Sequence, residues 1–177
     1  MGSVWFLWIV PFFLNRSRGQ GTAARIDPKA RIGILLVAAA FFIANTHRPV
    51  VWRTPVDLWR AVLGIILGLI AIALAWTAVG NLGRQWRVDA GLNTDHQLIQ
   101  SGAYRLVRHP IYLSILCNLA MTIAFAGTLP GWPIALVLGI LGTEIRVRVE
   151  DNLLHGRFGE RFTEWQQRVP AYLPFVR

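Results

Sequence analysis

The strongest constraint on this chain is the apolar run of residues 58–80, which carries no charged residue after Arg60. A helix of about 20 such residues is long enough to cross a hydrocarbon core about 30 Å thick. Trp59 and Trp76 lie near its ends, where aromatic rings favour the membrane interface. Of the 177 residues, 54% are hydrophobic and only 15% charged, too few to cover a water-facing globule. We therefore expect an integral membrane protein.

Four further apolar runs predict four more helices. Residues 111–129 and 132–143 are separated only by Pro130 and Gly131, which predicts a tight helical hairpin whose second helix continues into the charged sequence beyond. Residues 4–14 and 32–44 are shorter than the roughly 17 residues that a span usually needs, so whether they cross fully stays open. No positive charge precedes the first run, so we do not expect a secretory signal. The predicted fold is all-α, a polytopic helical membrane protein with about five transmembrane helices.

Gly64 and Gly68 form a small-xxx-small pair inside the longest run. Such a pair lets a neighbouring helix approach closely. Two glycines placed by chance in a membrane helix are the alternative explanation.

The net charge of +9 favours membrane topology over nucleic-acid binding, because the basic residues fall between the apolar runs. Segments 15–31, 81–110 and 146–177 carry five, four and six of the 18 Lys and Arg residues. Positive residues concentrate on the cytoplasmic side. We therefore expect the N-terminus outside and the long C-terminal tail in the cytoplasm, with membrane lipids as partners and no nucleic acid.

The single cysteine, Cys117, lies within an apolar run and cannot form an internal disulfide. The sequence has no CxxC or HxxxH pair of the kind that holds zinc. We expect Cys117 to be a small buried hydrophobe, and we expect no metal site.

Two polar stretches carry the candidate chemistry, residues 96–112 (HQLIQSGAYRLVRHPIY) and residues 146–177. The predicted topology places both on one side of the membrane, at the two ends of the helical hairpin. Antiparallel packing of that hairpin would bring them together. The result is a predicted site with one wall in the bilayer and one in water.

Three motifs in these stretches resemble the isoprenylcysteine carboxyl methyltransferase family: SGAYRLVRHPIY, EDNLLHGRFGERF and the closing RVPAYLPF. The resemblance covers residues 81–177. Asp151 stands where the family usually has Glu, which keeps the charge but shortens the reach. Phe162 stands where Tyr is usual, which removes a hydroxyl. The chain length and the lack of a linker or internal repeat predict a single membrane domain, 1–177, with transmembrane helices in 1–80. The resemblance implies a methyltransferase-like catalytic half in 81–177.

The resemblance also implies S-adenosylmethionine as cofactor, bound by the segment before the fourth helix and by the cytoplasmic tail. No GxGxxG follows a predicted strand, so a Rossmann-type site is not expected. Arg146 and Glu150 match the family's functional Arg and Glu. The residues carried over as cofactor-binding are His96, Leu98, Ile99, Gly102, Tyr104, His109 and Tyr112.

Plainer explanations exist for several of these residues. Arg146 and Glu150 are four apart and could form a surface ion pair. His109 precedes Pro110, so from the residues alone it is better explained as the entry to a helix. Tyr104 and Tyr112 could be interface anchors. We expect Trp165, Pro170, Pro174 and Phe175 to pack the tail onto the membrane surface.

Three functions follow as hypotheses. The first is methyl transfer to a lipid-like, prenylated or small apolar acceptor at the cytoplasmic membrane face. The alternative is an NADPH-dependent membrane sterol or steroid reductase, whose C-terminal half shares an RHP-Y element. The third is a non-catalytic membrane scaffold or lipid-binding protein. The acceptor atom and the oligomeric state are not predicted by the sequence.

Overall fold

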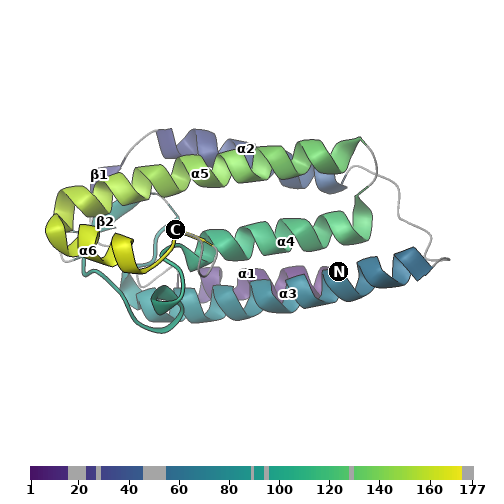
Figure 1. Ribbon diagram of the computed structural model, residues 1–177, viewed down its shortest axis with the longest axis horizontal. Helices are drawn as coiled ribbons and strands as arrows, with labels where there is room; N and C mark the ends of the chain where they lie inside the picture. Colours follow the sequence, from purple (N-terminus) through teal and green to yellow (C-terminus); the bar gives the residue numbers. More distant parts are fainter. Residues whose placement is uncertain are drawn as a thin grey trace.

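The computed structural model describes residues 1–15, 23–26, 29–45, 55–88, 90–93, 96–127 and 130–172. Five long helices run side by side in alternating directions, and a short sixth helix lies at one end of the bundle (Figure 1). The helices are α1 (Gly2–Leu14), α2 (Lys29–Asn45), α3 (Pro55–Leu82), α4 (Pro110–Ala126), α5 (Gly131–Phe158) and α6 (Glu160–Arg168).

Each of the five apolar runs forms a helix, as predicted; α4 ends at Ala126, and α5 continues past the apolar run to Phe158. Helix α4 runs antiparallel to α5 (Figure 1), but α5 packs mainly on α2 and α4 packs mainly on α3. The two helices are therefore consecutive and antiparallel, as predicted, but each packs more extensively on a helix outside the hairpin than on the other.

The glycine pair in α3 marks a close helix approach, as predicted. A Cβ on Gly64 would lie 2.6 Å from the ring of Phe125 in α4. A Cβ on Gly68 would lie 2.9 Å from Val4 in α1 and 3.1 Å from the sulfur of Met121. The two glycines thus allow α3 to pack against α4 and α1 together.

A small antiparallel sheet, which the sequence did not predict, joins two connecting segments. Strand β1 (Ala23–Ile26) pairs with β2 (Gly91–Asn93). Strands of four and three residues are too short to show the alternation that predicts a strand. This sheet brings the segments that follow α1 and α3 to the end of the bundle where α6 lies (Figure 1).

Within the described ranges, one helix is long and apolar enough to span a membrane, at Asp57–Leu82. Helices α1 and α4 are apolar but shorter. Large apolar side chains nevertheless cover the outside of the bundle, including Phe6, Phe42 and Trp59, which are 68%, 72% and 75% exposed. The count of five transmembrane helices stays a prediction.

Candidate active site

A cavity of about 420 Å³ lies at the end of the bundle where α6 contributes Trp165 to its wall. Side chains from all six helices line it, α3 through Leu82 alone, together with the segment that leads into α4. Of the nine residues singled out from the sequence, all but Gly102 line this cavity: His96, Leu98, Ile99, Tyr104, His109, Tyr112, Arg146 and Glu150. The predicted meeting of the two polar stretches is therefore confirmed.

Arg146 lies inside the bundle, with 7% of its surface exposed. Its Nε donates to the hydroxyl of Tyr112 at 3.0 Å, and its Nη2 donates to the carbonyl of Val88 at 2.8 Å. A third, longer bond runs from Nη1 to the carbonyl of Ala30 at 3.4 Å. The guanidinium carbon lies 5.5 Å from the centre of the Tyr112 ring. The alternative explanation of Arg146 and Glu150 as a surface ion pair is therefore wrong.

Glu150 is tied to Arg146 through Tyr112, whose hydroxyl donates to the Glu150 carboxylate. The other carboxylate oxygen lies 3.6 Å from Nδ1 of His109. Burial alone would raise the pKa of Glu150, but the bonds from His109 and Tyr112 and the charge of Arg146 outweigh it and lower the pKa. Glu150 thus places a negative charge on the cavity wall.

The His109 ring lies between two carboxylates and is itself buried. Its Nε2 lies 2.8 Å from an oxygen of Asp151, opposite the Glu150 contact at Nδ1. Burial alone would lower the pKa of His109, but Asp151 and Glu150 outweigh it and raise the pKa. His109 is also the residue that precedes Pro110 at the start of α4. It therefore both shapes the helix entry, as the residues suggested, and faces the cavity.

Arg108 and Asp151 are residues that the sequence did not single out for a role. Arg108 is 8% exposed, lines the cavity and pairs with Asp151 at 3.3 Å. The pKa of Asp151 is lowered because His109 and Arg108 together outweigh the opposing effect of burial. The RHP motif indicates the family but assigns no role to its arginine, Arg108. Asp151 differs from the family's usual Glu, and that difference by itself indicates no contact.

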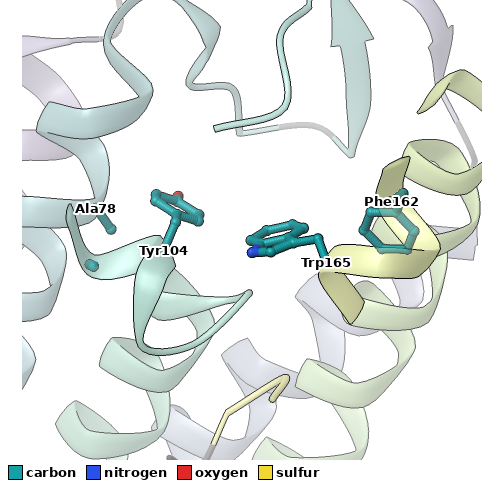
Figure 2. Packing of buried hydrophobic residues seen from close by; sticks show 5 residues of the cluster. Ala78, Tyr104, Phe162 and Trp165 are labelled. Carbon is teal, nitrogen blue, oxygen red and sulfur yellow. The ribbon is translucent and has the colours of Figure 1, made fainter. Parts of the chain in front are cut away.

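Figure 2 shows Tyr104 and Trp165 facing each other, with Phe162 beyond Trp165. Trp165 is 4% exposed and lines the cavity, so the prediction that it packs on the membrane surface is wrong. Pro174 and Phe175 lie outside the described residues. Phe162 is 1% exposed in an apolar cluster, an environment that suits a ring without a hydroxyl. Burial, aided by the charge of Glu150, raises the pKa of Tyr104 well above its usual value.

The segment before this cluster is held by side chains from the end of α3 and from the turn that follows it. The amide of Gln97 donates to the side chain of Gln85 at 2.7 Å. Gly102 has a φ of +60°, and a Cβ there would collide with Asn81. The Asn81 side chain instead accepts a bond from the amide of Ala103 at 3.3 Å. Gly102 thus shapes the turn that presents Tyr104, and its own atoms do not line the cavity.

The apolar side of the cavity comes partly from α1, a helix with no motif that connects it with the site. Trp8, Phe12 and Trp86 line it in a row, with ring centres 5.2 Å and 5.7 Å apart. The indole N–H of Trp8 donates to the hydroxyl of Ser114 at 3.3 Å, which fixes the ring. An apolar run gives no sign of which face lines a cavity.

The described part of the chain holds no group of three or more His, Cys, Asp or Glu side chains that could bind a metal ion. The ionisable groups of the cavity instead pair with one another and with backbone carbonyls.

Comparison with known sequences places this site in context. The model of the isoprenylcysteine carboxyl methyltransferase (ICMT) family matches residues 63–156. The cobalt-zinc-cadmium resistance protein CzcN of Cupriavidus metallidurans is 29% identical over 91% of this chain and 73% of that protein. Protein-S-isoprenylcysteine O-methyltransferase B of Arabidopsis thaliana is 28% identical over 67% of this chain and 61% of its own length. The human protein-S-isoprenylcysteine O-methyltransferase is 26% identical over 67% of this chain, which spans only 43% of it.

Among solved structures, the eukaryotic intramembrane Ras methyltransferase ICMT is similar with a TM-score of 0.60. The match covers 85% of this chain and 53% of that protein at 21% identity, a level that shows a shared fold. The family model covers more than half of the sequence. This chain therefore belongs to the isoprenylcysteine carboxyl methyltransferase (ICMT) family.

Proposed function

We propose that this chain is an S-adenosylmethionine-dependent methyltransferase acting on a lipid-like, prenylated or small apolar acceptor. The observation that carries this proposal is a single cavity with two kinds of wall. Arg146 and Glu150 on α5, with Arg108 and His109 just before α4, face the same space as the aromatic rings of Trp8 and Phe12 on α1. An acceptor with a polar head and an apolar body would fit both walls.

The residues present suit the cofactor that the family implies. The lowered pKa of Glu150 leaves a carboxylate for the cofactor's ammonium or sulfonium group. The indole N–H of Trp165 is buried and has no hydrogen-bond partner within the described ranges, so it can donate to a bound group. We propose that the cofactor is held by His96, Leu98, Ile99, Tyr104, His109 and Tyr112, with Gly102 setting the turn.

When bound, the cofactor supplies a methyl group whose bond to sulfur breaks as a bond to the acceptor forms, with the sulfur keeping the electron pair. The chain's own contribution is alignment and exclusion of water. Arg146 uses three N–H groups on neutral partners, Tyr112, Val88 and Ala30. A guanidinium has five such donors, so within the described residues two remain for an acceptor's carboxylate. We propose that Arg146 orients the acceptor and that Glu150 orients the cofactor.

We also propose the topology that the charge pattern predicts, with the N-terminus outside and the site and C-terminal tail in the cytoplasm. The meeting of segments 15–31, 81–110 and 146–177 at one end of the bundle supports it, because one side of the membrane must carry all three. The cavity draws on both 1–80 and 81–177, which supports treating 1–177 as a single membrane domain.

Two measurements on the purified protein test this function. S-adenosylhomocysteine should raise the unfolding temperature, since a ligand that binds only the folded state stabilises it. Labelled methyl groups should then pass from S-adenosylmethionine to a prenylcysteine analogue or to a component of a lipid extract. Protection by NADPH alone would favour the reductase, which the family and relatives above do not support. No protection and no transfer would favour the scaffold.

A further inference from the structure

The side chain of Arg108 connects the segment before α4 with the end of the chain. Its Nη1 donates to the carbonyl of Val169 at 2.5 Å and to that of Gln166 at 3.1 Å. Both carbonyls belong to the end of α6 and the residue after it. A helix leaves its last carbonyls without helical partners, so a cation at this position satisfies them.

Backbone bonds extend this connection along residues 169–172, which we term the docked tail. The amide of Arg108 donates to the carbonyl of Pro170 at 2.8 Å, and the amide of His109 donates to that of Ala171 at 3.0 Å. The hydroxyl of Tyr172 donates to Glu144 at 3.3 Å. The docked tail therefore lies directly against the residues that begin α4.

Asp151 orients the Arg108 guanidinium from the α5 side. It accepts a bond from Nη2 of Arg108 at 3.3 Å and contacts Nε2 of His109 at 2.8 Å. The Asp151 carboxylate thus contacts both Arg108, which binds the docked tail, and His109, which faces the cavity. Trp165, one turn before the docked tail, lines the cavity opposite Tyr104 (Figure 2).

We propose that Arg108 is a positioning residue that, oriented by Asp151, docks residues 169–172 and so sets the Trp165 wall of the cofactor pocket. The inference rests on the proposed function for the identity of the ligand. The planar guanidinium reaches one carboxylate and two carbonyls at once. A lysine keeps the charge but offers a single ammonium, which cannot reach all three in this geometry.

The test compares Arg108→Lys with Arg105→Lys, a matched change at an exposed position three residues earlier. In Arg108→Lys we expect S-adenosylhomocysteine to bind about tenfold more weakly, the size expected for a lost charged hydrogen bond. The KM for the methyl donor should rise by a similar factor, while kcat at saturation changes far less. Hydrogen exchange should become faster in residues 165–172. Arg105→Lys should match the wild type in all of these.

Wild-type affinity and exchange in Arg108→Lys would overturn the proposal, as would a loss confined to kcat. If that variant does not fold, exchange in the wild type decides: the amides of Arg108 and His109 must be protected, and rapid exchange there contradicts docking. Asp151→Asn gives a third check, with an intermediate loss of affinity expected and an unchanged affinity counting against the proposal. Failure of S-adenosylhomocysteine to bind the wild type would instead contradict the proposed function, and exchange at these two amides would still test the docking.

Discussion

Glu150 and Arg146 do not touch each other, yet they act on one hydroxyl. Arg146 donates a hydrogen bond to the Tyr112 hydroxyl, and this hydroxyl donates one to Glu150, so the phenol links the two charged side chains. The spacing of four residues along α5 predicted proximity but not this bridge. Both side chains also line the cavity, so one hydroxyl fixes the position of two groups of opposite charge on its wall.

Replacing Glu150 with Gln should weaken S-adenosylhomocysteine binding by about 10- to 100-fold, because a charged hydrogen bond is worth about 1.5–3 kcal/mol. Isothermal titration in detergent measures the effect. Glu164→Gln is the matched control, since Glu164 is exposed on α6. Equal affinities for the two variants would contradict the role proposed for Glu150.

His109 and its carboxylate partners predict that the free energy of unfolding falls at both low and high pH. Asp151 and Glu150 have lowered pKa values, so they stabilise the fold above their unfolded values of about 4 and lose that effect as pH falls. His109 has a raised pKa, so its stabilisation is complete below its unfolded value of about 6.5 and is lost as pH rises through the folded pKa. The free energy of unfolding should therefore be greatest in the mildly acidic range.

Thermal unfolding at a series of pH values checks this expectation. In His109→Gln the decline on the alkaline side should disappear, whereas His155→Gln, at an exposed position on α5, should keep it. An alkaline decline that survives in His109→Gln must come from another group.

At the scale of elements, the contact between α2 and α5 holds Arg146 in place. A Cβ on Gly33 of α2 would lie 2.6 Å from both Cγ of Arg146 and the carbonyl of Gly142. The nearby Ala30 carbonyl also accepts from Arg146. Helix α2 thus serves the site although it lies outside the residues that the family model matches.

Two glycine-to-alanine substitutions should therefore change the free energy of unfolding in opposite directions. Gly33→Ala should destabilise the protein by about 1–3 kcal/mol through overpacking, and should weaken acceptor binding as Arg146 shifts. Gly80→Ala in α3 meets nothing within 4 Å and should stabilise by up to about 1 kcal/mol, because alanine is the better helix former. Unfolding temperatures in detergent measure both. A neutral Gly33→Ala would mean that α2 and α5 can separate at little cost.

At the scale of the whole molecule, the chain is a membrane protein of the ICMT family whose apolar helix surfaces face outward. The cavity and its charged residues, including Arg108, Arg146 and Glu150, lie at the end of the bundle where α6 contributes Trp165 to the wall. The opposite end carries the turn between α4 and α5 and the start of α3. This polarity is what a membrane protein needs if its site is to receive a soluble cofactor and an apolar acceptor together.

The proposed topology predicts a simple labelling pattern. A single cysteine placed at exposed Arg157, in a background with Cys117 replaced by Ala, should react with an impermeant maleimide only after the cells are opened. A cysteine at exposed Pro130, in the α4–α5 turn at the opposite end, should react in intact cells. The reverse pattern would invert the orientation, and labelling of both in intact cells would show that the bundle does not cross the membrane.

The sequence by itself was enough to predict the helices and part of the cavity lining, whose functional roles stay predictions. Runs of apolar residues without charge have no stable alternative to a helix in lipid, because every backbone group must be bonded internally. The motifs around His109 and Glu150 are local, so their residues could be named from the chain alone. Eight of the nine residues named in this way line the cavity.

Only the tertiary structure decided which helices are neighbours and which side chains complete the site. An apolar run does not encode its partner, so the packing of α5 on α2 and the aromatic row on α1 could not be predicted. The bonds from Arg108 to the docked tail join residues about 60 positions apart. Such contacts arise from the geometry of two chain segments brought together, a property that no single stretch of sequence contains.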